Sequence, residues 1–207
     1  GLELSLGFAV NGWLAPDTAL TKHGARPGDA LILAKPLGAG VLLAAAMRGR
    51  ARADWLDEAL AVMALSNAVA AVTLRAHGAH ALTDVTGFGL CGHLLEMLTA
   101  SGAAARVHLD ALPRLAGAAE LAAQGVASTL APDNRRAAEA VRIDDAAASH
   151  PALPLCFDPQ TGGGLLAALP ARDAPACVTA LRAAGYADAA VIGEVLAARP
   201  GALSLEA

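Results

Sequence analysis

Residues 84–97, with the sequence DVTGFGLCGHLLEM, constrain the fold of this chain more than any other stretch. The preceding residues 80–83 predict a strand, and residues 88–100 carry apolar side chains at helical spacing. Gly87 and Gly89 lie between the two segments and allow the tight turn that joins them. The sequence therefore predicts a strand that passes directly into a helix, with the carboxylate of Asp84 at the junction.

Such a junction is suited to binding a metal–nucleotide complex. The unpaired N–H groups and the dipole of a helix N-terminus attract phosphate. A carboxylate beside bound phosphates can hold Mg²⁺, because this ion keeps several waters and needs only one or two protein oxygens. We therefore predict Asp84 as a metal ligand and Thr86, Gly87 and Gly89 as residues that contact the nucleotide. The alternative is that Asp84 or Thr86 only caps the helix.

The longer string resembles the D-V-T-G-F-G-L-x-G-H-L-x-E-M signature of the selenophosphate synthetase (selenide, water dikinase) family, within the aminoimidazole ribonucleotide synthetase-like superfamily. Residues 28–40 resemble its G-D-x-L-I-L-T-K-P-L-G-T-G segment, and residues 157–166 resemble its F-D-P-Q-T-S-G-G-L-L segment. The three matches occur in the family's order and are spread along nearly the whole chain. One departure is Gly162, which stands where the family has a serine.

This resemblance implies an enzyme that converts ATP, selenide and water to selenophosphate, AMP and phosphate. It also implies that Asp84 joins aspartates of an N-terminal domain to bind Mg²⁺ on the ATP phosphates. The family's nucleophilic cysteine or selenocysteine, its catalytic lysine and its glycine-rich loop lie in that N-terminal domain. The resemblance also implies a homodimer that forms through the same domain. We therefore expect no catalytic residue in this chain, and no activity of the chain alone.

Two other functions are compatible with the same fold. One is a different ATP-using member of the superfamily, such as aminoimidazole ribonucleotide synthetase, thiamine monophosphate kinase or the hydrogenase-maturation dehydratase. The G-F-G-L-x-G-H continuation after Asp84 speaks against it. The other is a non-catalytic assembly module that retains the fold. The presence of Asp84 argues mildly against a module, which needs no metal carboxylate.

Composition excludes several other classes of function. The net charge is −4 and the basic residues are scattered, so no basic face for nucleic acid is expected. The longest apolar stretch, residues 59–74, is shorter than the roughly 20 residues that span a membrane. The N-terminus shows no charged leader or cleavage pattern, so we expect a cytoplasmic protein. The cysteines are widely spaced, which predicts free buried thiols at Cys91, Cys156 and Cys177.

The order of the segments predicts an α+β (layered α/β) domain, with a mixed sheet covered by helices. Alternating apolar residues predict a strand in residues 1–11; by resemblance, residues 1–13 are the last strand of an N-terminal domain, and residues 14–207 form the C-terminal domain. The expected strands are residues 30–34, 79–84, 106–109, 165–169 and 189–196. The expected helices are residues 40–50, 54–76 with Asp54 as N-cap, 88–100, 113–124 and 173–184, whereas residues 126–154 give only a weak pattern.

The remaining polar residues of these segments favour structural roles. His93 is predicted to be a hydrogen-bonded core histidine, and Glu96 a solvated or ion-paired residue. Lys35 could approach phosphate, but a surface or ion-pair position is at least as compatible with its sequence. Asn67 interrupts an apolar helix, so we expect it to be hydrogen-bonded internally. Residues 158–164 precede a strand rather than a helix, which favours an ordinary tight connection over a phosphate loop.

Overall fold

The computed structural model describes residues 7, 9, 11–14, 19–139, 141–197 and 201–207. In these residues one seven-stranded sheet has the order β2-β5-β1-β6-β3-β7-β4. The strands are β1 Asp29–Leu33, β2 Ala81–Asp84, β3 Ala104–His108, β4 Arg142–Ile143, β5 Leu165–Pro170, β6 Ala190–Leu196 and β7 Leu203–Glu206. The α-helices are α1 Ala39–Met47, α2 Ala53–Ala64, α3 Ala68–Ala76, α4 Gly89–Ser101, α5 Ala118–Ala123, α6 Ala131–Ala137 and α7 Ala174–Ala183. Short 3₁₀ helices are η1 Leu109–Ala111, η2 Ala147–Ser149 and η3 Leu153–Cys156.

The sheet is mixed, as the sequence predicted. Strands β2, β5, β1, β6 and β3 pair antiparallel in succession, whereas β7 pairs parallel with β3 and β4. Because β1 and β2 are both antiparallel to β5, the carboxyl ends of β1 and β2 lie at the same edge of the sheet. The segment that enters β5 begins between them. This edge is where the residues of the sequence motifs meet.

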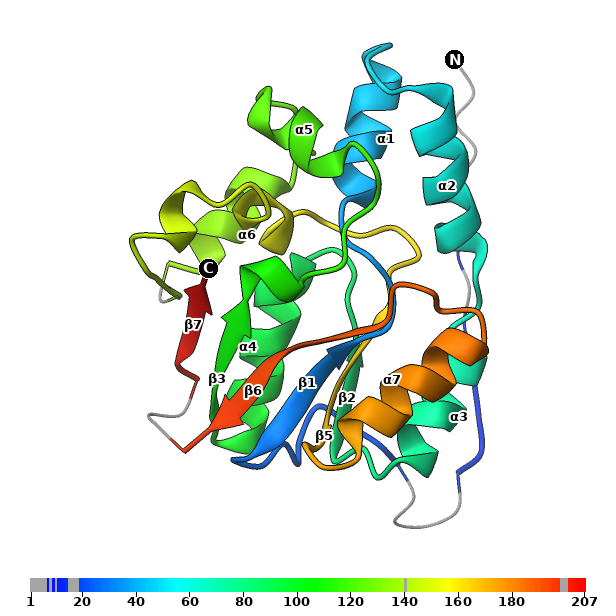
Figure 1. Ribbon diagram of the computed structural model, residues 1–207, viewed down its shortest axis with the longest axis vertical. Coiled ribbons are helices and arrows are strands. Elements are labelled where there is room, and N and C mark those ends of the chain that lie inside the picture. Colours follow the sequence, from blue (N-terminus) through cyan, green and yellow to red (C-terminus); the bar gives the residue numbers. More distant parts are fainter. Residues whose placement is uncertain (1–6, 8, 10, 15–18, 140, 198–200) are drawn as a thin grey trace.

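Strand β1 is buried on both faces, and this accounts for its continuous apolar sequence. Leu31 and Leu33 belong to a hydrophobic cluster shared with α1 and α4. Ala30 and Ile32 belong to a second cluster, shared with α3 and α7. In Figure 1, α3 and α7 lie in front of the sheet on the side of β2 and β5, and α4 lies behind the sheet, where β3 and β6 are drawn. The helices thus form layers on the two faces of the sheet.

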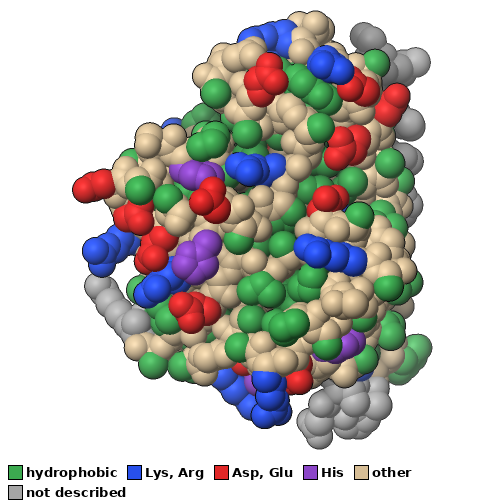
Figure 2. Space-filling view, in the orientation of Figure 1, with side chains coloured by type: hydrophobic (Ala, Val, Ile, Leu, Met, Phe, Trp, Pro, Cys, Tyr) green, Lys and Arg blue, Asp and Glu red, His purple; other side chains and the backbone are tan. Residues whose placement is uncertain are grey.

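In the other part of the front face, the labelled strands β6, β3 and β7 have no helix drawn in front of them in Figure 1. Charged and histidine side chains gather on this side of the molecule in Figure 2. Arg106 of β3 pairs there with Glu194 of β6 at 3.8 Å and with Glu206 of β7 at 3.1 Å. Cross-strand pairs of opposite charge stabilise an open sheet face that stays in water.

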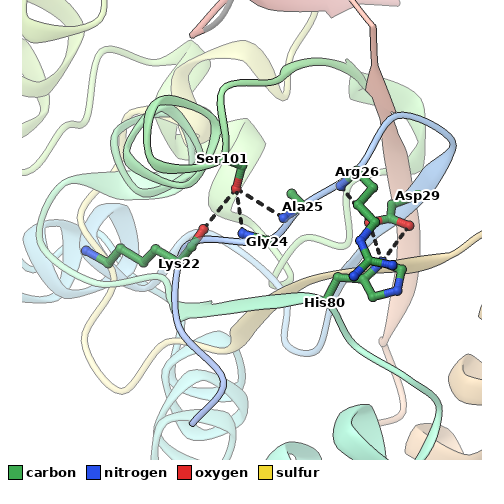
Figure 3. Close-up of polar contacts among 7 residues, drawn as sticks. All are labelled: Lys22, Gly24, Ala25, Arg26, Asp29, His80 and Ser101. Carbon is green, nitrogen blue, oxygen red and sulfur yellow. Dashed lines mark hydrogen bonds and ion pairs between the residues drawn. The ribbon is translucent and has the colours of Figure 1, made fainter. Parts of the chain in front are cut away.

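The chain enters the sheet along α4 and the outer edge of β2. Ser101 Oγ, at the end of α4, accepts hydrogen bonds from the amides of Gly24 and Ala25, each at 3.1 Å, and donates to the Lys22 carbonyl (Figure 3). Next to it, Asp29 of β1 lies 2.9 Å from His80 Nδ1. These contacts fasten residues 22–29 beside the strand that carries Asp84.

One predicted helix, residues 54–76, is wrong: it is two helices, α2 and α3, bent by 62°. The break is stabilised by groups from distant segments. Lys35 Nζ donates to the Leu65 carbonyl, and the Tyr186 hydroxyl donates to the Ser66 carbonyl at 2.6 Å. The Tyr186 oxygen also accepts from the Ala70 amide at 2.9 Å. Because backbone groups released by a break must find other partners, these contacts favour two helices over one.

Two further details differ from the expectation. Arg52, not Asp54, stands at the N-cap of α2, and the Asp54 carboxylate accepts hydrogen bonds from the Arg52 guanidinium. The helix expected at residues 113–124 is reduced to α5, because residues 113–115 pair with Leu37 as an extended segment. Strand β7 was not predicted. The strand expected at residues 1–11 falls mainly on positions outside those described, so that strand and the domain boundary near Leu14 stay predictions.

Two other expectations concern the helices and the cysteines. Within the described residues no single helix is long and apolar enough to span a membrane, and only the bent pair of α2 and α3 together meets that criterion. Cys91, Cys156 and Cys177 are buried free thiols, as predicted. A hydrogen bond with Cys156, together with burial, raises the pKa of Cys91 well above its ordinary value.

Candidate functional site

The candidate site lies at the edge of the sheet where β1 and β2 end and β5 begins. Asp84 pairs with Leu165 in the sheet register, and the Val85 amide donates to the Gly164 carbonyl at 2.9 Å. On the other side, the Ala34 amide donates to the Leu165 carbonyl at 2.9 Å. The three motif segments are far apart in the sequence, and here they are hydrogen-bonded to one another.

Asp84 is the exposed last residue of β2. No side chain of the described residues forms an ion pair or hydrogen bond with its carboxylate. The alternative that Asp84 or Thr86 caps the following helix is wrong, since Phe88 is the N-cap of α4 and no side chain caps it. The charge of Asp84 is therefore available to a ligand.

Thr86 and His93 form a contact within the same motif. Thr86 Oγ1 lies 3.2 Å from His93 Nε2, which is within hydrogen-bond distance. His93 is buried on α4, and its ring packs near that of Phe88, with 5.5 Å between ring centroids. The prediction of a hydrogen-bonded core histidine is confirmed. Glu96 pairs with Lys22 at 2.5 Å, so its predicted ion pair is also present.

The two glycines of the turn differ. Gly89 has φ +67°, and a Cβ there would approach the backbone of Phe157 and Asp158 to 2.9 and 3.1 Å, so only glycine fits. Its amide donates to the Thr86 carbonyl at 3.0 Å, which closes the turn. At Gly87 no atom lies within 4 Å of the Cβ position. The Gly87 amide has no acceptor among the described residues, so of the two glycines predicted to contact the nucleotide, Gly87 is the one whose N–H is free to donate to a ligand.

The segment 158–164 is more than the tight connection that the sequence indicated. Gln160 Oε1 accepts from the amides of Gly38 and Ala39 at 3.0 and 3.2 Å, and Asp158 Oδ2 accepts from the Val41 amide at 3.2 Å. The first amides of α1 therefore obtain their partners from this distant segment. Asp158 is 1% exposed, and burial raises its pKa to about 6. No pattern in the sequence indicated that Asp158 and Gln160 are buried.

Lys35 is the clearest correction in the site. It is not a surface lysine: it is 2% exposed, and Nζ donates to the carbonyls of Leu65 and Gly162, the latter at 2.9 Å. Burial lowers its pKa. Asn67, as predicted, is hydrogen-bonded internally, with Nδ2 donating to the Gly163 carbonyl at 2.9 Å. Lys35 and Asn67 thus hold the glycine-rich segment in place through hydrogen bonds to its backbone carbonyls.

A hollow of about 330 Å³ opens beside Gly87, between α1 and residues 127–130. Gln160 and Thr161 form another part of its wall, and Arg48 lies at α1. Within the part of the chain that the structure describes, no group of three or more His, Cys, Asp or Glu side chains could hold a metal ion. Asp84 could therefore supply only part of a metal site.

The family described as "AIR synthase related protein, C-terminal domain" matches residues 26–206. The chain belongs to this family. It is 43% identical to a selenide, water dikinase of Myxococcus xanthus, over 96% of this chain and 57% of that protein. It is 40% identical to a selenide, water dikinase of Pelobacter propionicus, over 94% of this chain and 56% of that protein. The chain thus spans just over half the length of these relatives, and they confirm the resemblance carried by the three motifs.

Solved structures of proteins with other names have a similar fold. A hydrogenase maturation protein HypE has a TM-score of 0.67 and 24% identity, over 93% of this chain and 53% of that one. A thiamine-monophosphate kinase from Stenotrophomonas maltophilia has a TM-score of 0.58 and 19% identity, over 93% of this chain and 54% of that one. At these identities the likeness shows the fold alone, and it confirms the predicted layered class.

Proposed function

We propose that this chain is the C-terminal part of a selenide, water dikinase, which converts ATP, selenide and water to selenophosphate, AMP and phosphate. The observation that carries the proposal is the exposed carboxylate of Asp84, at the start of an open glycine turn, in a chain 43% identical to a relative with that name. The activity requires groups that this chain does not supply. In this proposal they belong to a preceding domain, which also forms a homodimer.

The residues at the sheet edge fit a magnesium ion held jointly with other groups. Asp84 is an exposed carboxylate without a protein partner in the described residues, and Mg²⁺ commonly takes only one or two carboxylates beside substrate phosphates. A bound Mg²⁺ would stabilise negative charge on the transferring phosphoryl group. Asp84 is the ligand that we assign to it from this chain.

The turn after Asp84 has the donors that a polyphosphate needs. The Thr86 hydroxyl, next to His93, and the open Gly87 amide lie within three residues of Asp84. Gly89 shapes the turn, and any contact of its own would be through the backbone. We assign Thr86 and Gly87 to the binding of ATP phosphates, with Gly89 as the residue that lets the turn close. In this proposal the fold positions the donors of the turn, and Asp84 supplies the negative charge that binds Mg²⁺.

The test is Asp84→Asn in the complete polypeptide that carries this chain. Asparagine keeps the shape but removes the charge, so kcat/KM for ATP should fall by about a hundredfold or more. The free energy of unfolding should change by less than about 1 kcal/mol, because the side chain is exposed and unpaired within the described residues. Asp57→Asn, at an exposed position on α2, is the matched control and should retain full turnover.

The readout is selenide-dependent formation of AMP and orthophosphate from ATP. Normal turnover in Asp84→Asn would remove this residue from the metal site. AMP formation by residues 1–207 alone would contradict the assignment of the essential groups to a preceding domain. Turnover of ATP with a different acceptor, and none with selenide, would place the protein with another ATP-using member of the superfamily.

A further inference from the structure

Helix α6 is attached to the candidate site by a side chain rather than by a hydrophobic face. None of its residues is buried, yet Asn134 reaches two backbone carbonyls. Its Nδ2 donates to the Gly87 carbonyl at 2.8 Å and to the Phe157 carbonyl at 3.0 Å. Gly87 belongs to the turn after Asp84, and Phe157 directly precedes Asp158. One amide group therefore holds together the two segments that form the site.

A second contact fixes the same helix over the same segment. The Arg135 guanidinium lies 5.4 Å from the centroid of the Phe157 ring, in cation–π geometry. Asn134 also borders a hollow of about 540 Å³ between α4 and α6, with Phe88 and Lys22 among its other lining residues. The hydrogen bonds of Asn134 are thus part-buried at the border of this hollow and not in the hydrophobic core.

The bond to Gly87 sets the direction of a neighbouring donor. In a planar trans peptide the C=O and N–H groups point in opposite directions. When Asn134 draws the Gly87 carbonyl toward α6, the N–H of Phe88 in the same peptide must point away from α6. Phe88 is the N-cap of α4, and its N–H has no acceptor among the described residues, whereas the next amide, that of Gly89, donates to the Thr86 carbonyl.

We propose that Asn134 is a positioning residue for nucleotide binding. By holding the Gly87 and Phe157 carbonyls, it fixes the orientation of the Gly87–Phe88 peptide, whose N–H, with that of Gly87, contacts the phosphates of the nucleotide. This inference rests on the proposed function, and it adds α6, which contributes no motif residue, to the machinery of the site. A purely structural Asn134 would affect stability and leave nucleotide affinity unchanged.

The experiment compares Asn134→Ala, Asn134→Asp and Asn134→Gln in the complete polypeptide. Alanine removes both donors, and KM for Mg-ATP should rise about tenfold while kcat changes less than about threefold. Aspartate keeps the size but opposes two carbonyl oxygens, so its KM should rise at least as much. Glutamine retains the amide and should recover most of the affinity. Arg136→Ala, on the same helix, is the control and should behave as wild type, because the one ion pair of Arg136 within the described residues is with the exposed Asp133.

A second readout does not depend on turnover. Hydrogen exchange of the amides in residues 85–90 should be faster in Asn134→Ala and unchanged in Arg136→Ala. Unchanged affinity and unchanged exchange in Asn134→Ala, with wild type binding Mg-ATP, would overturn the inference and leave the proposed function standing. A fall in kcat at constant KM would also overturn it. A wild type that does not bind Mg-ATP would overturn both.

Discussion

Two glycine-containing segments meet at the end of β2, and they are opposite in character. The turn from Asp84 to Gly89 has an exposed aspartate and an open position at Gly87. The segment from Asp158 to Gly164 has an aspartate that is 1% exposed, and its glycines have no space for a side chain. Both contain the residue types of a phosphate site. The difference lies in which polar groups the protein itself already satisfies.

In the second segment most of the polar groups that face the protein have partners, although Asp158 Oδ1 has none among the described residues. Asp158 and Gln160 accept from the first amides of α1, and Lys35 and Asn67 donate to the carbonyls of Gly162 and Gly163. The segment from Asp158 to Gly164 in turn holds the turn after Asp84, because the backbone N–H of Gln160 donates to the Thr86 carbonyl at 3.0 Å. The comparison indicates a division of labour in which a rigid loop supports an open one.

The largest expected effect comes from placing the same side chain in both loops. In Gly163→Ala the new Cβ would overlap the Val85 carbonyl and the Gln160 side chain, whereas in Gly87→Ala it would meet nothing within 4 Å. Gly163→Ala should lower the free energy of unfolding by roughly 3 kcal/mol or prevent folding, as overpacked sites do. Gly87→Ala should change it by less than about 1 kcal/mol. Chemical denaturation of both variants is the measurement.

The matched pair can fail in either direction. Equal losses in the two variants would show that the Gly87 turn is as tightly packed as the supporting segment. Equal tolerance would show that the segment at Gly163 can shift away from Val85. Either result would remove the contrast between a rigid loop and an open one.

A smaller effect concerns the buried carboxyl of Asp158. Because its pKa in the folded protein is about 6, above the ordinary value, the folded state binds this proton more tightly than the unfolded state does. The contribution of Asp158 to stability is therefore largest below about pH 4, and it is lost as the pH rises through 6. Asp158→Asn does not ionise there, so from pH 4 to pH 7 its stability relative to wild type should rise by about 2–3 kcal/mol.

Urea denaturation of both proteins at several pH values between 4 and 7 checks this. A constant difference across that range would mean that Asp158 titrates normally and is hydrated.

The sequence predicts the parts of this fold whose causes are local. Strand β5 and helix α7 follow from runs of apolar residues bounded by turn residues, and they appear within one or two positions of the expectation. The motif turn also follows from local rules, because Gly89 requires a positive φ. The signature around Asp84 then identifies the exposed carboxylate without any knowledge of its neighbours.

What the sequence misses depends on distant partners. The break between α2 and α3 is supported by Lys35 and Tyr186, which are far away in the chain, so helical periodicity could not reveal it. For the same reason Lys35 looked like a surface residue. Asp158 and Asp84 are chemically identical side chains, each followed by turn-forming residues. Only their burial shows that Asp158 supports the fold whereas Asp84 is a candidate metal ligand.

The smallest expected effect is that of deleting residues 1–11. This deletion tests whether the domain that contains both loops is complete without residues 1–11. The hydrogen bonds that hold the two loops come from residue 35 onward, and β2 is supported upstream by residues 21–29, beginning with the Thr21 carbonyl, which accepts from the Leu82 amide at 2.9 Å. We therefore expect the free energy of unfolding to change by less than about 0.5 kcal/mol. The alternating apolar residues Leu2, Leu4, Leu6, Phe8 and Val10 predict a strand face that favours self-association, so any dimer should shift toward monomer in sedimentation. If the deletion unfolded the domain, the first strand would belong to its core, the boundary near Leu14 would be wrong, and the rigid loop would depend on residues before it.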